Sequence, residues 1–179
     1  MIFEYMHHDL TGLLSRVKLQ EDQIKNLIRQ MFEGLQYLHL KNIMHRDLKG
    51  SNLLINSKGE LKLADFGLAR TEFQTSRPKM EHYTNRVITL WYRSPELLLG
   101  STKYDFTVDI WSAGCIFLEF YEGKPVFCGK DEISQLEKLW RMVGTPDPVT
   151  YPEVQDLAWW DMMRPASVYP SQLKETFRG

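Results

Sequence analysis

A cluster of polar and charged residues runs from His45 to Asn52 in the stretch HRDLKGSN. Asp47 can accept the proton of an attacking hydroxyl, and Lys49 can balance negative charge on a transferring phosphate. Asn52 offers a neutral amide oxygen to a metal ion. Phosphoryl transfer needs this combination because the protein mainly orients the reactants and neutralises their charge. The residue types and their spacing therefore indicate phosphoryl-transfer chemistry.

A second motif, Asp65-Phe66-Gly67, follows an apolar segment. If that segment is a strand, the Asp65 carboxylate emerges at its end, where it suits a hard oxygen site for Mg²⁺. His45 is interpreted as a packed histidine that supports the loop rather than as a chemical group. The two motifs together predict a site for a metal and a phosphate.

Hydrophobic periodicity predicts the helices that must position these motifs. Apolar residues recur at helical spacing over 21–39, which indicates one buried helical face. The segment 108–123 is apolar on nearly all sides and predicts a buried central helix that ends at Gly123. A shorter amphipathic helix is predicted over 131–144.

Strands and loops are predicted between these helices. Residues 53–55 and 60–66 read as two strands of a hairpin around the turn NSKG. Ile2 to Met6 is interpreted as a short β-like stretch. The polar segment 67–88 has no strong period and is predicted to be a long surface loop, of a length that is usually either functional or disordered.

Composition excludes several classes of protein. The chain has 179 residues and a formal net charge of −1, so no overall basic field favours direct nucleic-acid binding. No apolar run is long enough for a membrane span. Cys115 and Cys128 show no CxxC spacing, which argues against a disulfide framework and a cysteine zinc site. The composition is that of a globular domain.

Three motifs in order carry a family resemblance. HRDLKGSN, LADFGLAR and WYRSPE resemble the signature set of protein kinases. YTNRVITLWYRSPELLLG is similar to the cyclin-dependent kinases, which have Leu before WYR where mitogen-activated kinases have Arg. Residues 65–96 also lack the Thr-x-Tyr pair of the mitogen-activated kinases, which argues against that type. KGSN and DLAWWDMMRP resemble the transcriptional type, above all the catalytic subunits that phosphorylate the RNA polymerase II C-terminal domain.

The resemblance implies an α+β protein-kinase fold. It would be mainly the α-helical C-terminal lobe, with a small β-hairpin at the catalytic cleft and no N-terminal lobe. The chain would be a partial kinase domain over 1–179, consisting of a hinge (1–9), a catalytic loop (45–52), an activation segment (65–96) and truncated C-lobe helices (97–179).

The same resemblance implies roles for the two motifs. Asp47 would be the catalytic base, Lys49 would contact the γ-phosphate of ATP, and Thr89 would hydrogen-bond within the catalytic loop. Asn52 and Asp65 would hold Mg²⁺. The implied cofactors are therefore ATP and Mg²⁺.

Five further residues are implied to surround the nucleotide. Phe3 resembles the gatekeeper behind adenine, and Glu4 and Met6 resemble the hinge, whose backbone groups hydrogen-bond the adenine edge. Asp9 resembles the ribose contact, and Leu54 would form the adenine floor.

Thr84 resembles the activation-loop phosphosite. A phosphate adds about −1.5 to −2 charge and favours clustered arginines, and Arg46 and Arg70 match the arginines that would receive it. Binding of both to one phosphate would order the loop. Val87 to Arg93 would line the pocket after the phosphoacceptor, which in this family favours Ser/Thr followed by Pro.

Two acidic residues have implied structural roles. Asp109, at the start of the central helix, would brace the catalytic loop through backbone N–H groups. Glu96 of the SPE motif would pair with an arginine, but no arginine after residue 93 matches that motif. We therefore expect Glu96 to be left unpaired, which is costly for a buried carboxylate.

Several parts of the family pattern are missing from the sequence. No glycine-rich loop, strand lysine or helix glutamate precedes the hinge. A cyclin is the implied partner, but its docking helix would lie in that same region. We therefore expect the chain alone to bind ATP poorly and to expose apolar surface on its 108–123 and 131–144 helices.

Two functional hypotheses follow. In the first, the chain is the core of a nuclear serine/threonine kinase that acts on Ser/Thr-Pro sites, such as those of the RNA polymerase II C-terminal domain. In the second, it is a truncated, catalytically inactive fragment that acts at most as a partner-binding module. The intact Asp47, Lys49, Asn52 and Asp65 favour the first, and the missing N-terminal lobe favours the second.

Overall fold

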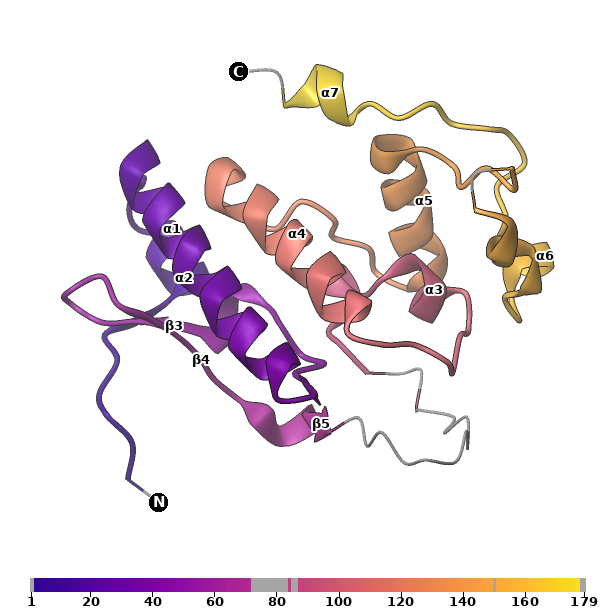
Figure 1. Cartoon of the computed structure of the whole chain (residues 1–179). Coiled ribbons are helices and arrows are strands. Elements are labelled where there is room, and N and C mark those ends of the chain that lie inside the picture. Colours follow the sequence, from indigo (N-terminus) through magenta and orange to yellow (C-terminus); the bar gives the residue numbers. More distant parts are fainter. Residues whose placement is uncertain (1, 72–83, 85–86, 150, 178–179) are drawn as a thin grey trace.

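A computed structural model of the chain describes residues 2–71, 84, 87–149 and 151–177. Most of the predicted loop 67–88 lies outside the described residues. Figure 1 shows a helical body with a small sheet on one side. The α-helices are α1 (Leu10–Leu14), α2 (Glu21–Leu40), α3 (Pro95–Leu98), α4 (Thr107–Glu122), α5 (Glu132–Val143), α6 (Trp160–Met163) and α7 (Leu173–Thr176). The strands are β1 (His8–Asp9), β2 (Ile43–Met44), β3 (Leu53–Ile55), β4 (Leu61–Leu63) and β5 (Arg70–Thr71).

Two helices form the centre of the body. α2 buries the periodic apolar face that the sequence predicts, which confirms this helix, and it packs beside α4 (Figure 1). α4 ends at Gly123, whose φ of 72° is the left-handed conformation that glycine adopts without steric cost. The helix predicted over 131–144 is also confirmed, as α5.

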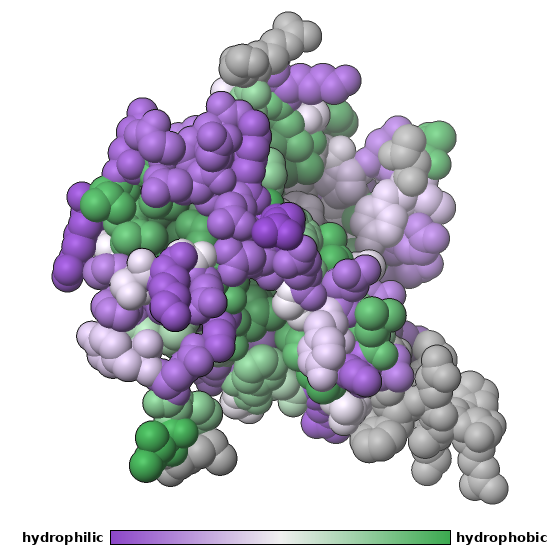
Figure 2. Space-filling model, turned by 60° about the vertical axis from the view of Figure 1, so that its left-hand side comes forward, coloured by the Kyte–Doolittle hydropathy of each residue, from purple (hydrophilic) through white to green (hydrophobic). Residues whose placement is uncertain are grey.

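The exposure of α4 differs from the prediction of a buried helix. Ile110, Phe117 and Tyr121 are 48%, 39% and 46% exposed. They recur at intervals that place them on one face of the helix, while Val108, Ile116 and other residues on the opposite faces are buried. Figure 2 shows hydrophobic side chains at the surface among hydrophilic ones. The described residues leave this face of α4 uncovered, which agrees with the expectation that the 108–123 helix exposes apolar surface.

Two small sheets bracket the polar motifs. β1, β3 and β4 form an antiparallel sheet in which Leu53 pairs with Leu63, so the predicted hairpin is confirmed with a shorter second strand. β2 and β5 form the other sheet, and Met44 pairs with Arg70. This second pairing places the start of the stretch 45–49 beside the end of the segment that contains Asp65.

The β-like stretch predicted over Ile2 to Met6 is wrong. These residues form no strand, and Ile2 and Tyr5 are almost fully exposed. The first strand is instead β1, which has β3 as its partner. A strand needs a neighbour to satisfy its backbone groups, and the described residues offer none beside residues 2–6.

A large hollow opens beside α4. A cavity of about 890 Å³ lies between α4, the segment 101–105 and the C-terminal region, lined by Trp111, Leu118 and Leu157 among others. In the described part of the chain, no helix has both the length and the apolar character needed to cross a bilayer.

Candidate active site

The catalytic-loop stretch is anchored by a fully buried carboxylate on α4. Asp109 Oδ2 accepts hydrogen bonds from the backbone N–H of His45 at 2.8 Å, and Asp109 Oδ1 accepts from that of Arg46 at 2.9 Å. His39 Nε2 lies 3.0 Å from Oδ2. Arg46 has a φ of 64°, which is unfavourable for a residue with a side chain. The contacts to Asp109 stabilise that turn of the backbone.

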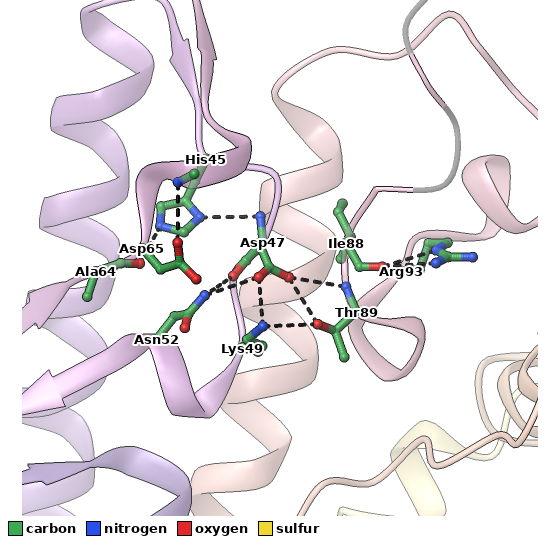
Figure 3. A network of polar contacts seen from close by, with 10 residues as sticks. His45, Asp47, Lys49, Asn52, Ala64, Asp65, Ile88, Thr89 and Arg93 are labelled. Carbon is green, nitrogen blue, oxygen red and sulfur yellow. Dashed lines mark hydrogen bonds and ion pairs between the residues drawn. The ribbon is translucent and has the colours of Figure 1, made fainter.

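Asp47 lies at the centre of a polar network (Figure 3). Its Oδ1 accepts from the backbone N–H of Thr89 at 3.2 Å and from the Thr89 hydroxyl at 3.0 Å. Its Oδ2 accepts from Lys49 Nζ at 2.7 Å and from Asn52 Nδ2 at 3.3 Å. Asp47, Lys49, Asn52 and Thr89 are thus brought together. Thr89 arrives from a turn 42 residues further along the chain.

His45 connects this network to the segment that precedes Asp65. Its Nδ1 accepts the backbone N–H of Asp47 at 3.3 Å, and its Nε2 lies 3.0 Å from the carbonyl oxygen of Ala64 (Figure 3). These two contacts fit a neutral imidazole with its proton on Nε2. Burial lowers the pKa of His45, although the Asp109 carboxylate opposes that effect. The interpretation of His45 as a packed, supporting histidine agrees with this position.

The lowered pKa of His45 predicts a pH dependence of stability. As the pH falls through the unfolded value of 6.5, the unfolded chain takes up a proton that folded His45 resists, so the free energy of unfolding decreases. Urea unfolding between about pH 7.5 and about pH 5.5 measures this decrease. We expect the decrease to be smaller in His45→Gln.

The histidine prediction has an internal control. His8→Gln removes an exposed histidine and should keep the wild-type pH dependence. Glu96 and Glu119, whose pKa values are raised by burial, affect all three proteins alike and cancel in the difference. Equal pH dependence in wild type and His45→Gln would contradict the prediction.

Asn52 and Asp65 present oxygen atoms that suit a magnesium ion. The Asn52 amide nitrogen donates to the Asp47 carbonyl at 2.8 Å, so its amide oxygen remains available as an acceptor. Asp65 has a φ of 63° and an exposed carboxylate, whose Oδ1 accepts from the Gly67 N–H at 3.3 Å. In the described residues, no three His, Cys, Asp or Glu side chains form a metal cluster. The donor set therefore fits Mg²⁺ that takes further ligands from phosphate and water.

The residues predicted to surround the nucleotide are only partly brought together. Asp9 caps α1 by accepting the Gly12 N–H at 2.9 Å, and it pairs in the sheet with Leu54. Phe3 is 79% exposed, and the Glu4 carboxylate lies 2.8 Å from Lys62 Nζ.

The structure therefore does not support a packed gatekeeper at Phe3. Because no strand forms over residues 2–6, the described chain gives that side chain nothing to pack against. Met6 is partly buried, and β1 begins two residues later.

Arg46 reaches toward the segment that contains Thr84. Its Nε donates to the carbonyl of Leu68 at 2.7 Å, and its Nη1 donates to the Tyr104 hydroxyl at 3.1 Å. That hydroxyl in turn donates to the carbonyl of Thr84 at 3.0 Å. Arg70 lies in β5, which pairs with β2 just before Arg46. The sequence did not predict the contacts of Tyr104, because the residues around it look like those of any surface loop that contains a tyrosine.

Arg93 holds the backbone of the predicted substrate pocket. Its guanidinium donates to the Ile88 carbonyl at 3.1 and 3.2 Å (Figure 3). It also donates to the Val87 carbonyl at 3.0 Å, and its Nη1 lies 3.3 Å from Glu132. Ile88 has a φ of 67°, a rare conformation for a β-branched residue. Ile88 is thus a strained position in the pocket that periodicity could not identify.

Glu96 lines the cavity beside α4, and burial raises its pKa. Among the described residues, no lysine or arginine lies within ion-pair distance of it. Trp111, on the same cavity wall, has a buried indole N–H without a hydrogen-bond partner in the described part of the chain. The expectation of an unpaired Glu96 agrees with this geometry.

Comparison with known proteins assigns the family. A sequence model described as the protein kinase domain matches residues 1–169. The chain belongs to the protein kinase family. The α+β kinase fold, dominated by helices, is therefore confirmed. The Asp47 network, the Asp65 motif and Arg93 all lie within the residues that this model matches.

Individual relatives show which type of protein kinase the chain is similar to. The kinase chain is 56% identical to the CTD kinase subunit alpha of Schizosaccharomyces pombe over 99% of its length and 30% of the relative. It is 44% identical to the subunit of the same name from Saccharomyces cerevisiae, over 99% of the chain and 34% of the relative. It is 46% identical to cyclin-dependent kinase 12 of Caenorhabditis elegans, over 99% and 24%. The recognition of a transcriptional cyclin-dependent type is confirmed at this level of similarity.

A solved structure gives the same result. The crystal structure of the yeast RNA polymerase II CTD kinase complex CTDK-1 contains a chain with a TM-score of 0.91 and 42% identity, covering 98% of this kinase chain and 57% of that one. The kinase chain spans about a third of the length of the curated CTD kinase subunits.

Proposed function

We propose that the chain carries the catalytic centre of a serine/threonine protein kinase that transfers the γ-phosphate of ATP to a hydroxyl. The observation that carries this proposal is the Asp47 carboxylate, whose Oδ1 accepts from the Thr89 hydroxyl and whose Oδ2 accepts from Lys49 Nζ. In that geometry Asp47 orients the substrate hydroxyl and accepts its proton, while Lys49 balances charge on the phosphate.

ATP and Mg²⁺ are the proposed cofactors. Asn52 and Asp65 would hold the metal, which neutralises charge on the phosphates when bound. Met6, Asp9 and Leu54 would contact the adenosine part. Asp9 of β1 pairs with Leu54 of β3, and Met6 lies two residues before β1. Thr84 is proposed as the phosphosite of the activation segment, with Arg46 and Arg70 as its receivers.

The pocket geometry favours proline after the phosphoacceptor. Both contacts from Arg93 occupy the Ile88 carbonyl, so that oxygen is not free to accept an N–H from an incoming peptide. Every residue except proline would leave its N–H without a partner there. The strained φ of Ile88 supports the proposal of Ser/Thr-Pro specificity.

The names of the relatives suggest the substrate and the partner. We propose the RNA polymerase II C-terminal domain as substrate in transcription elongation, a cyclin as partner and the nucleus as location. The alternative is an inactive fragment that binds partners, which the 30% coverage of the S. pombe relative keeps open.

Phosphate transfer from labelled ATP to matched Ser-Pro and Ser-Ala peptides tests the proposal. We expect Mg²⁺-dependent incorporation that is faster into the Ser-Pro peptide than into the Ser-Ala peptide, at an ATP concentration high enough to offset the weak ATP binding expected of this chain. A folded wild-type chain that transfers no phosphate would favour the partner-binding alternative.

Replacement of Arg93 should weaken the preference for proline. In Arg93→Met the Ile88 carbonyl loses its partner and becomes available to a peptide N–H. We expect the ratio of kcat/KM for Ser-Pro over Ser-Ala to fall about tenfold, because roughly one hydrogen bond is regained by the Ser-Ala peptide. Arg141→Met, which removes an exposed arginine of α5, is the matched control. An unchanged ratio in Arg93→Met would refute this explanation of specificity.

A further inference from the structure

A second buried carboxylate of α4, Glu119, joins segments that are far apart in sequence. Its Oε2 accepts from the Tyr92 hydroxyl at 2.7 Å, and its Oε1 accepts from the Thr11 hydroxyl at 3.3 Å. Glu119 is fully buried, and burial raises its pKa. A buried acidic group of this kind is costly unless it is well hydrogen-bonded, so these contacts hold the three elements together.

The end of the catalytic loop packs directly on this carboxylate. A Cβ atom at Gly50 would lie 2.8 Å from Glu119 Oε1 and even closer to the Thr11 hydroxyl. No side chain fits there without a shift of its neighbours. Glycine at this position therefore lets the backbone approach Glu119, and the loop is seated on the carboxylate.

Each joined segment carries part of the proposed active site. α1 is capped by Asp9, on the nucleotide side. The short 3₁₀ turn η1 (Gly50–Asn52) carries the proposed metal ligand Asn52. The 3₁₀ turn η3 (Leu90–Tyr92) directly follows Thr89, which hydrogen-bonds Asp47 on the substrate side.

α4 thus supports the loop at two points. Asp109 binds the start of the catalytic loop. Glu119, ten residues further along α4, packs against the end of the loop at Gly50. At 1.5 Å per residue, the two backbone positions lie about 15 Å apart along the helix axis. Because α4 is a continuous helix, the separation of Asp109 and Glu119 along it sets the separation of the two ends of the catalytic loop.

We propose that Glu119 is a positioning residue that fixes the distance between the nucleotide side and the substrate side of the site. It contacts no reacting atom and acts through Thr11, Gly50 and Tyr92. Only its effect on catalysis rests on the proposed kinase function, because the structural connection exists independently of it.

Amide hydrogen exchange of the chain tests this proposal without requiring activity. Glu119→Met keeps the size of the side chain but cannot accept the two hydrogen bonds. We expect exchange to become about tenfold faster in segments 10–15, 48–54 and 88–93, and to stay within about twofold over 43–47, which Asp109 anchors. Glu119→Gln keeps one acceptor oxygen and should give intermediate rates. Glu122→Met, an exposed change on the same helix, should leave all four segments unchanged.

Two results would overturn the proposal. Unchanged exchange in Glu119→Met would show that Glu119 only fills space, and an equal increase in all four segments would show general destabilisation. If Glu119→Met does not fold, Tyr92→Phe removes one donor and should accelerate exchange in 48–54 and 88–93 but not in 43–47, and its failure to do so overturns the proposal.

Phosphate transfer provides a separate readout. We expect Glu119→Met to lower kcat about tenfold and Glu119→Gln to restore part of it. A wild-type chain without transfer activity would contradict the proposed function and leave the exchange result to decide the role of Glu119.

Discussion

Asp109→Asn should lower the free energy of unfolding by about 3 kcal/mol, because a buried acceptor of several hydrogen bonds becomes a partial donor. The carboxylate accepts from His45, Arg46 and His39 and is fully buried. An asparagine of the same shape has only one acceptor oxygen. Its amide nitrogen is a donor and would face a backbone N–H of the loop, which is also a donor. The left-handed turn at Arg46 loses part of its stabilisation in the same change.

Urea unfolding followed by circular dichroism measures this effect. Asp156→Asn, an exposed change of the same chemistry, is the matched control and should stay within about 0.5 kcal/mol of wild type. Hydrogen exchange at residues 45–46 should rise in Asp109→Asn before global unfolding. Equal unfolding midpoints for the two variants would show that Asp109 does not anchor the loop.

The sequence was sufficient to predict elements that depend on local pattern. α2 and α5 bury one periodic face each, and β3 and β4 flank a turn whose residues favour a hairpin, so their patterns are self-contained. Residues 2–6 failed as a strand because β pairing depends on a neighbour that local pattern cannot supply. Apolar surface on α4 was expected from the missing parts of the family pattern, but the sequence could not show which face of this apolar helix would be exposed.

The site shows the same division between local and distant information. Asp47, Lys49 and Asn52 lie within six residues, so their proximity follows from the sequence. The resemblance also assigned Thr89 and Asp109 to the loop. Tyr104 was left without a role, and its hydroxyl bridges Arg46 and Thr84. His45 and Ile88 had expected positions, but the ring contacts of His45 and the positive φ of Ile88 were not predicted. These features arise only when distant segments meet.

Asp47→Asn should reduce phosphate transfer about 10³-fold, because asparagine can still accept a hydrogen bond from Thr89 but cannot take up the proton of the substrate hydroxyl. The fold should persist, since the replacement has the same shape and Lys49 remains partly exposed to water. In the described structure Asp47 contacts none of the three proposed adenosine residues. It does contact the proposed metal ligand Asn52, whose amide nitrogen donates to the Asp47 carbonyl at 2.8 Å. Asp47→Asn keeps that carbonyl, so the Kd for ATP should change by no more than about twofold.

Single-turnover transfer to a Ser-Pro peptide, together with ATP titration by fluorescence, separates these two effects. Asp161→Asn, whose side chain is 91% exposed, is the matched control and should transfer at the wild-type rate. Loss of transfer with intact ATP binding would assign Asp47 to the chemical step. Transfer by Asp47→Asn at the wild-type rate would show that the carboxylate is not the proton acceptor, and the network around it would then serve only to hold the loop.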